Sequence, residues 1–395
     1  MIYNNIITED FISKYWQKKP FLFERNATAT SLINSSPLSI ATVIDLLQKE
    51  EVESRVVFTE GDPQELNFDV LEGPFDFEEL KSIEETLYTY LIQDINQEFF
   101  EIDAYYNMFS GLSAWQQANV MVSYSNAGGS VGPHRDRYDV FLWQIQGERK
   151  WYLENDKRPN NVESKYDDLE ILEDFKKDKE LILKTGDILY IPPNVAHWGI
   201  SQSESLSLSF AFRRPSVYDF FMYMISEEIE GELENDELFP APELYGNYNN
   251  SNVNEIKRVY SDKIIELLEK KLESLKSKIH TSKSQNMLAS YLGEESQVTD
   301  AYDNLPLDDS MILKSTLVYF PGIRVSYTVE KEGVVLFAGF EKFNINADVP
   351  LAEFLCKNKQ FSVSQLLKVS SIESSDKYYI ELCKQFIIAG VCFLK

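Results

Sequence analysis

In the run Ser205-Leu-Ser-Leu-Ser-Phe-Ala-Phe212, a small residue (Ser or Ala) alternates with a large apolar residue (Leu or Phe) without a break. Neighbouring side chains of a strand point to opposite faces, so this run predicts a strand with one dry and one polar side. Many short strands without regular helices between them favour a jelly roll or barrel. Four further short runs rich in β-forming residues precede it, broken by Gly, Pro and Asn: 119–125, 138–145, 149–153 and 188–191.

Two segments flank or interrupt these strands. Residues 8–19 predict a helix, because Thr8 can cap it and the acidic Glu9 and Asp10 suit its positive end. The charged segment 154–185 predicts a surface insertion on the barrel. We therefore expect residues 1–215 to form one mainly β domain.

Beyond residue 216 the hydrophobic period becomes helical. A long helix with a continuous apolar stripe needs a partner to cover it, and we favour a second copy of the chain. Residues 216–300 therefore predict an α-helical dimerisation region and a homodimer. The stripe consists of Ile256, Tyr260, Ile264, Leu268, Leu272, Leu275 and Ile279.

The last segment, residues 301–395, predicts a small winged-helix α+β domain. It contains ten Lys and Arg against eleven Asp and Glu, so it is nearly neutral. A domain that reads a DNA groove usually has a basic face, so this charge argues against sequence-specific nucleic-acid binding. Strand-like runs are 315–329, 334–339 and 389–394, and helical patterns are 350–356, 362–369 and 374–388.

The formal net charge is −26, and nearly all the excess acid lies in residues 1–300. An acidic surface repels nucleic acid and attracts basic proteins. No apolar run approaches the roughly 18 residues of a membrane span, and the first ten residues lack a secretory signal pattern. We expect a cytoplasmic protein with no membrane partner. Its three cysteines lack zinc-ligand and Cys-x-x-Cys spacing, and we interpret them as buried thiols.

Two of the three histidines lie in patterns typical of a metal site. A glycine-rich turn leads into His134-Arg-Asp136, and we expect His134 and Asp136 at the start of a strand, pointing to the same side. Downstream, a strand and a Pro-Pro turn lead to His197. Two imidazoles and one carboxylate on one face of a metal form the site preferred by non-haem Fe(II) oxygenases. His280 is expected to be a solvated surface residue.

Arg149 follows the turn at Gln146-Gly147 and shares a strand face with Trp151. It could therefore point into the barrel, where a guanidinium needs a carboxylate partner. A dicarboxylate cosubstrate would supply one in a charge-assisted pair. The alternative is an outward Arg149 among exposed charges.

At these residues the sequence resembles the cupin-like JmjC ribosomal oxygenases, and especially their bacterial arginine-hydroxylase branch. The resemblance is carried by Phe11–Phe23, Ser123–Trp151 and Gly186–Pro215, above all by Gly132-Pro-His-Arg-Asp-Arg-Tyr-Asp-Val-Phe141. It implies a double-stranded β-helix catalytic domain, followed by the helical dimerisation region and the winged helix.

The resemblance also implies chemistry. Iron(II) would be held by His134, Asp136 and His197, and 2-oxoglutarate would place its distal carboxylate on Arg149, with Ser125 and Ser207 beside it. Oxygen would be the oxidant, and 2-oxoglutarate would be decarboxylated to succinate. The implied reaction is hydroxylation of an arginine side chain in a large-subunit ribosomal protein, the sixteenth of the L series. An acidic enzyme suits such a basic substrate.

Other readings stay open. Arg135 and Arg137 flank Asp136, and two cations beside the pocket would repel an arginine unless they point outward. A JmjC oxygenase acting on histidine or methyl-lysine is the nearest alternative. A non-catalytic metal-binding cupin is a further alternative, which a buried Arg149 opposes. A winged-helix regulator is another, which the neutral C-terminal domain opposes.

Overall fold

The computed structural model describes residues 5–213 and 307–395, apart from 35, 63–64, 113–115, 155–168, 321–322, 330–332, 339–340, 347 and 372–374, plus four single residues between the two ranges. The chain divides into two compact units, Met1–Arg214 with Phe320–Gly322, and Pro215–Tyr319 with Ile323–Lys395. The division into three domains stays a prediction, because almost none of residues 214–306 are among those that the structure describes. The helical stripe and His280 also lie outside the described residues.

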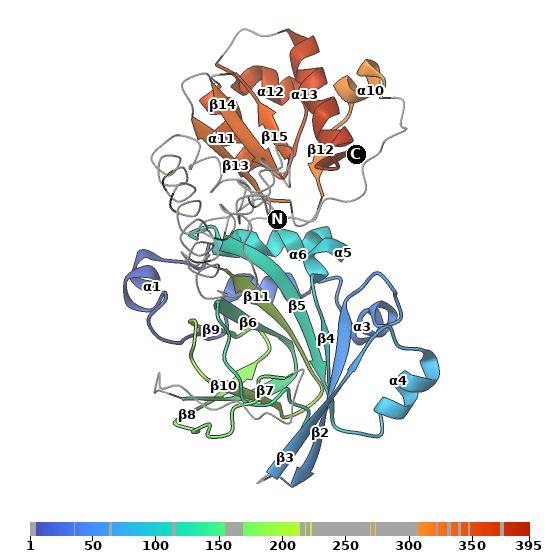
Figure 1. The fold of residues 1–395 in the computed structure, drawn as a ribbon, viewed down its shortest axis with the longest axis vertical. Coiled ribbons are helices and arrows are strands. Elements are labelled where there is room, and N and C mark those ends of the chain that lie inside the picture. The colour runs from blue at the N-terminus through green and yellow to red at the C-terminus, as the bar shows by residue number, and fades with distance from the viewer. Residues whose placement is uncertain are drawn as a thin grey trace, which may run out of the picture. The chain divides into compact units, whose positions relative to one another are not determined.

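An eight-stranded antiparallel sheet forms the body of the N-terminal unit (Figure 1). Its spatial order is β1-β9-β6-β11-β5-β4-β2-β3. All five predicted β-runs of residues 119–212 form strands, although their bounds shift by one or two residues in three of them. The strands are β1 (Phe21–Phe23), β2 (Ser54–Asp62), β3 (Glu65–Glu72), β4 (Tyr88–Ile92), β5 (Gln117–Ser125), β6 (Asp139–Gln146), β9 (Ile188–Ile191) and β11 (Ser205–Phe212).

A second sheet, of order β10-β7-β8, closes over the inner face of the first (Figure 1). It consists of β7 (Glu148–Leu153), β8 (Lys179–Lys184) and β10 (His197–Ser201). Apolar side chains from both sheets pack in one interior cluster, which includes Val140, Leu142, Leu189 and Ile191 from the large sheet and Trp151, Leu153 and Leu183 from the small one. The mainly antiparallel cupin-like architecture predicted from the sequence is therefore present.

Strand β8 corrects the prediction that residues 154–185 are a surface insertion. Residues 179–184 pair with β7 along its whole length. The strand was missed because four of its six side chains are exposed and only Leu183 is buried. Its solvent side carries Glu180, the exposed Ile182 and Lys184, so apolar and charged side chains do not separate cleanly between the two faces of this edge strand.

The outer face of the large sheet carries the main core. Short helices cover it and contribute Phe11, Leu32, Val43 and Phe109 to a cluster with strand residues such as Phe210. These helices are α1 (Glu9–Lys14), α2 (Ala27–Ile33), α3 (Ile40–Leu46), α4 (Phe77–Ile83), α5 (Ile95–Glu98), α6 (Phe100–Ala104) and the 3-10 turn η1 (Tyr105–Phe109).

Helix α1 is shorter than the predicted 8–19. Thr8 caps it as expected, with its hydroxyl accepting the Phe11 N–H at 3.1 Å. The helix ends at Lys14, and Gln17 then adopts a left-handed backbone with φ 58°. The Gln17 N–H donates instead to the Tyr190 hydroxyl at 2.7 Å. A bond to strand β9 thus replaces the next helical hydrogen bond.

Strand β11 has the predicted dry and polar sides, yet both are buried. Its leucines and phenylalanines join the main core. Ser205, Ser207 and Ser209 face the interior between the two sheets and are only 0%, 2% and 8% exposed. The polar side therefore lines the inside of the barrel instead of its surface.

The C-terminal unit is an α+β fold with two three-stranded sheets, ordered β16-β12-β17 and β13-β14-β15. All three predicted helices are present, whereas the predicted strand 315–329 divides into β12 and β13. Helix α10 and strands β15 and β16 were not predicted. The elements are α10 (Asp309–Lys314), β12 (Leu317–Tyr319), β13 (Val325–Val329), β14 (Val334–Ala338), β15 (Glu341–Asn344), α11 (Val349–Lys357), β16 (Gln360–Phe361), α12 (Val363–Val369), α13 (Asp376–Ile388) and β17 (Cys392–Leu394).

The three cysteines of this unit are unpaired thiols, and burial raises the pKa of Cys356 and of Cys383 to about 12. Cys383 and Cys392 are buried, as expected, whereas Cys356 is only partly buried. Over the part of the chain that the structure describes, no helix combines the length and apolarity needed to cross a membrane.

Candidate metal centre

His134 and His197 face each other across an isolated antiparallel bridge. The His134 N–H donates to the His197 carbonyl at 3.0 Å, and the His197 N–H donates to the His134 carbonyl at 3.0 Å. Directly opposed residues of an antiparallel pair project their side chains to the same side. The two imidazoles therefore converge, with their ring centroids 4.3 Å apart.

This pairing corrects one detail of the sequence argument. His134 and Asp136 do not lie on the following strand, because β6 begins only at Asp139. They lie on the extended segment that leads from the glycine turn to β6. Its position is set by the bridge to His197 and by the bond from the Asn194 N–H to the Asp136 carbonyl, 2.8 Å long. Asn194 belongs to the Pro-Pro turn before β10 and has φ 63°.

Each imidazole has its Nδ1 engaged by the backbone two residues earlier. The His134 Nδ1 lies 3.0 Å from the Gly132 carbonyl, and the His197 Nδ1 lies 2.9 Å from the Val195 carbonyl. A carbonyl oxygen only accepts, so Nδ1 carries the proton in both rings. The lone pair is then on Nε2, which is the atom that can bind a metal.

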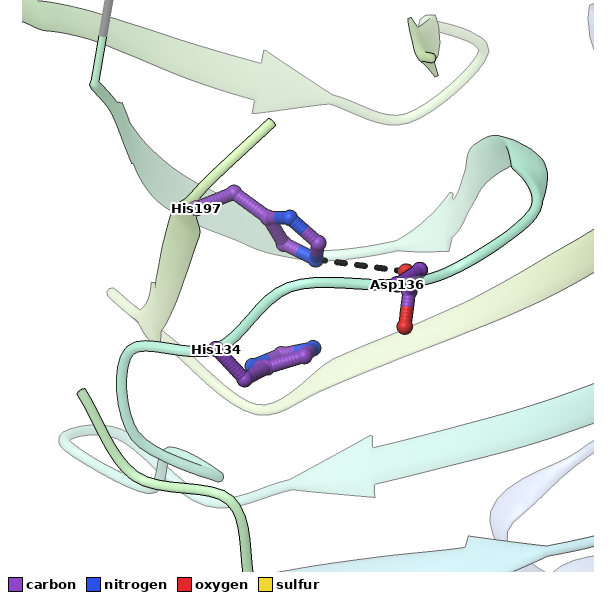
Figure 2. Close-up of side chains that lie close together, drawn as sticks. All are labelled: His134, Asp136 and His197. Carbon is purple, nitrogen blue, oxygen red and sulfur yellow. Dashed lines mark ion pairs between the residues drawn. The ribbon is translucent and has the colours of Figure 1, made fainter. Parts of the chain in front are cut away.

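The third member, Asp136, completes a compact donor cluster (Figure 2). Its Oδ2 lies 3.5 Å from the His197 Nε2, and one donor atom of each of the three residues lies within 4.8 Å of the other two. Among the described residues this is the one group of three or more His, Cys, Asp or Glu side chains with such geometry.

The surroundings of His197 keep its ring in the form that a metal requires. Burial, followed by the proximity of His134, lowers the pKa of His197 to about 4, so its ring is neutral at neutral pH. The hydroxyl of Tyr138 is hydrogen-bonded to the Asp136 carboxylate, and burial together with that charge raises the pKa of Tyr138 well above its usual value. Tyr138 therefore stays a donor that can orient the carboxylate.

Arg149 points inward, as predicted, and is 7% exposed. Its Nη1 donates to the Ser123 hydroxyl at 3.0 Å and its Nη2 to the Ser125 hydroxyl at 2.7 Å. Burial lowers the pKa of Arg149 to about 10, so the group is still charged at neutral pH. Within the described ranges no carboxylate forms an ion pair with it, and its Nε has no hydrogen-bond partner.

Arg149 and His197 lie along one face of the small sheet, and His134 meets His197 from the segment before β6. Arg149 pairs with Ser201 and Leu153 pairs with His197 in the register of β7 and β10. Four residues along a strand correspond to about 13 Å. Between them lies Trp151, whose ring centroid is 5.7 Å from that of His197. A charged anchor and a metal cluster therefore share one buried wall with an aromatic spacer.

The remaining predicted residues lie on the opposite wall. Ser125 is fully buried and also bonds the Thr89 hydroxyl, with the two oxygens 2.8 Å apart. Ser207 is buried on β11, opposite Ser123 and Gln144 in the strand register. The sequence analysis missed Ser123, Thr89 and Gln144. Ser123 had a usable signal, since it lies two residues before Ser125 on the same strand face.

The two arginines beside Asp136 differ in their surroundings, and the charge of Arg135 is close enough to contribute to the lowered pKa of His197. The Arg137 side chain is 85% exposed and pairs with Glu170 at 3.6 Å. Arg135 donates to the Asn194 carbonyl. Arg137 therefore points outward and does not line the pocket. Arg135 is hydrogen-bonded to the Pro-Pro turn.

Comparison with known proteins agrees with this geometry. Residues 104–220 match the family described as JmjC domain. A probable ribosomal oxygenase of Haemophilus influenzae is 34% identical over 220 residues, 54% of this chain and 51% of that protein. The ribosomal protein uL16 3-hydroxylase of Escherichia coli is 32% identical over 231 residues, 58% of this chain and 59% of that protein. The chain thus spans between half and three fifths of the length of these curated relatives.

Solved structures match the whole chain. The X-ray structure of Escherichia coli YcfD aligns over 100% of both chains with a TM-score of 0.77 and 24% identity. YcfD, described as a ribosomal oxygenase, has also been solved in complex with cobalt and 2-oxoglutarate, and that structure gives a TM-score of 0.73 at 23% identity. These matches establish the fold of the chain.

Proposed function

We propose that this chain, which contains a JmjC domain and has ribosomal oxygenases among its relatives, is an iron(II)- and 2-oxoglutarate-dependent protein hydroxylase. The observation that carries the proposal is the pairing of two features on one buried wall. A His-Asp-His cluster lies at one end of it, and the charged Arg149, without a carboxylate partner among the described residues, lies at the other.

The donor set fits iron(II). Two neutral imidazole nitrogens and one carboxylate are the ligands of a facial triad, which leaves other metal positions open. Iron(II) bound there together with 2-oxoglutarate would supply the oxidation of a C–H bond to C–OH by oxygen, while 2-oxoglutarate is converted to succinate and carbon dioxide. His134, Asp136 and His197 would hold the ion, and Tyr138 would orient the carboxylate of Asp136.

The interior also fits a dicarboxylate. A guanidinium has five N–H donors, and Arg149 uses one each on Ser123 and Ser125. The Nε of Arg149, the hydroxyl of Ser201 and the indole Nε1 of Trp151 are buried without a partner. Buried polar atoms without partners are rare in proteins, and an anionic ligand would satisfy them. Ser125 and Ser207 would line the same pocket.

For the substrate, we propose an arginine side chain of a basic large-subunit ribosomal protein, the sixteenth of the L series. The name of the Escherichia coli relative supports this choice. The net charge of −26 favours encounter with a cationic protein. Arg137 points outward and leaves room for a positively charged side chain.

We further propose that residues 216–300 form a helical dimerisation region, that the α+β unit after residue 301 is a winged helix used for protein contact, and that the enzyme is a cytoplasmic homodimer. The two three-stranded sheets and the four helices α10 to α13, all within residues 307–395, support the winged-helix assignment. Its near-neutral charge supports protein contact over nucleic-acid binding.

Succinate formation tests the proposal. The full chain is incubated with iron(II), oxygen and 2-oxoglutarate, with and without purified ribosomal proteins, and the proteins are analysed by mass spectrometry. We expect succinate together with one added oxygen on an arginine of one ribosomal protein. Hydroxylated histidine or demethylated lysine would replace the substrate assignment and keep the chemistry. Absence of succinate under all these conditions would leave a non-catalytic metal-binding cupin.

A further inference from the structure

The hydroxyl of Ser130 joins the two segments that carry the histidines. It donates to the Gly199 carbonyl at 2.7 Å, two residues after His197. It accepts the indole N–H of Trp198 at 2.8 Å and the backbone N–H of Gly132 at 3.1 Å. Ser130 is 3% exposed, so all three bonds are shielded from water. One side chain thus cross-links the glycine turn to strand β10.

These bonds lead directly to the first histidine. Gly132, held through its N–H by Ser130, offers its carbonyl to the Nδ1 of His134 at 3.0 Å. That carbonyl determines the tautomer of His134 and the direction of its Nε2. Gly132 has φ 78°, a left-handed backbone in which the orientation of its peptide groups depends on the hydrogen bonds that they make. The path runs from Trp198 through Ser130 and Gly132 to His134.

Trp198 is itself held in place on the outer side of β10. Its ring lies beneath the Lys177 ammonium, which is 4.2 Å from the ring centroid, and Phe175 meets it edge-on at 6.1 Å. Tyr152 packs beside it with ring centroids 6.0 Å apart. The indole is therefore immobilised by its neighbours, and its N–H has one fixed direction, toward Ser130.

The fold of this segment has a separate support, which the Ser130 hydroxyl does not supply. The Thr59 hydroxyl donates to the Ser130 carbonyl at 3.0 Å and accepts the Ser130 N–H at 3.2 Å. The Ser201 N–H bonds the Gly129 carbonyl at 3.1 Å, and the His134–His197 bridge closes the other end. The backbone path is thus set by these bonds, which leaves the Ser130 side chain to fix the finer orientation.

We propose that Ser130 and Trp198 are positioning residues of the metal centre, which hold the Gly132 carbonyl so that the Nε2 of His134 stays aimed at the ion. This inference rests on the proposed metal site. Partners beyond the ligands commonly change metal affinity by about 10- to 100-fold when they are removed. The loss of the Ser130 hydroxyl is therefore expected to weaken metal binding, and not only to lower thermal stability.

The test measures cobalt(II) affinity and the visible spectrum of the cobalt(II) complex with the full chain, without 2-oxoglutarate. Ser130→Ala removes the hydroxyl, whereas Ser130→Thr keeps one. Trp198→Phe removes the indole N–H and keeps an aromatic ring at this position. Ser54→Ala is the matched control, because Ser54 is 4% exposed in the same unit and its hydroxyl has no hydrogen-bond partner. His134→Ala reports the loss of a ligand.

We expect Ser130→Ala and Trp198→Phe to weaken cobalt(II) binding by about tenfold or more and to alter the spectrum. Ser130→Thr should recover most of the affinity, and Ser54→Ala should match the wild type. If wild type binds cobalt(II) and His134→Ala does not, while Ser130→Ala and Trp198→Phe bind as wild type, the positioning role is refuted and the metal site stands. If wild type itself fails to bind, the metal site and this inference fall together. Should Ser130→Ala not fold, Trp198→Phe decides the question.

Discussion

Replacing Arg149 by methionine removes the buried positive charge while keeping most of the side-chain volume. Of the five N–H donors of this guanidinium, two are committed to Ser123 and Ser125, which leaves three for the distal carboxylate of 2-oxoglutarate. A hydrogen bond between charged groups contributes about 1.5–3 kcal/mol. Losing a paired contact of about 3 kcal/mol corresponds to an increase of about 100-fold in the 2-oxoglutarate requirement.

The assay is succinate formation as a function of 2-oxoglutarate concentration at fixed iron(II) and substrate protein. Arg149→Lys is the informative companion, because it keeps the charge but presents it as a point instead of a planar fork. We expect its 2-oxoglutarate requirement to lie between those of the wild type and Arg149→Met. Cobalt(II) affinity without 2-oxoglutarate should be nearly unchanged in both, since Arg149 touches no metal donor in the described hydrogen bonds.

Thermal unfolding provides a second measurement, in which Arg149→Met is expected to preserve or improve stability while it impairs the use of 2-oxoglutarate. In the absence of 2-oxoglutarate, Arg149 is a buried charge with only neutral partners, a costly arrangement. Arg149→Met should therefore unfold at the same or a higher temperature than wild type, and should lose the stabilisation that 2-oxoglutarate gives. A 2-oxoglutarate requirement within about twofold of wild type in Arg149→Met would refute the reasoning, because tenfold corresponds to only 1.4 kcal/mol.

Three further outcomes follow from particular residues. His134→Ala should abolish succinate formation while circular dichroism stays that of the wild type, and residual turnover would remove His134 from the metal centre. Gly147→Ala should destabilise the protein by about 2 kcal/mol or more in urea unfolding, since Gly147 has φ 73° and a Cβ there would collide with the Glu204 carbonyl; an unchanged midpoint would contradict this. Cys383 should react slowly with iodoacetamide at pH 8 in the native protein and rapidly in denaturant, because burial raises its pKa to about 12 and few thiolates form; rapid native labelling would oppose it.

The sequence was most informative where a hydrophobic pattern and burial agree. Residues 188–191 and 205–212 form strands with the predicted bounds, because their apolar side chains pack into the main core and, for Leu189 and Ile191, into the cluster between the two sheets. The pattern failed where charge conceals a strand. Strand β8 was taken for an insertion, and β2 and β3, with their interspersed Arg and Glu residues, were not predicted, although β2 pairs with both β3 and β4.

The structure brings together the three residues that were proposed from the sequence as metal ligands, but by a local geometry that differs from the predicted one. His134, Asp136 and His197 do converge, but through a bridge between two segments that are 63 residues apart. Alternation along a strand is a local rule, and it placed two of these side chains on a strand that starts later. The pairing of two distant segments depends on tertiary hydrogen bonds, and the periodicity of residues within one segment does not predict these bonds.

The serines of β11 show how burial changes the meaning of an alternating pattern. In an antiparallel sheet with one wet face, such serines would contact solvent and carry no further information. Here a second sheet covers them, and Ser205, Ser207 and Ser209 are nearly inaccessible. Hydroxyls cost free energy when they are taken from water without a partner. A strand that keeps its polar side inside a closed barrel, next to a buried arginine, has therefore retained an interior suited to a polar ligand. In this chain that polar lining, more than the histidines alone, supports the proposed cosubstrate pocket over a purely structural core.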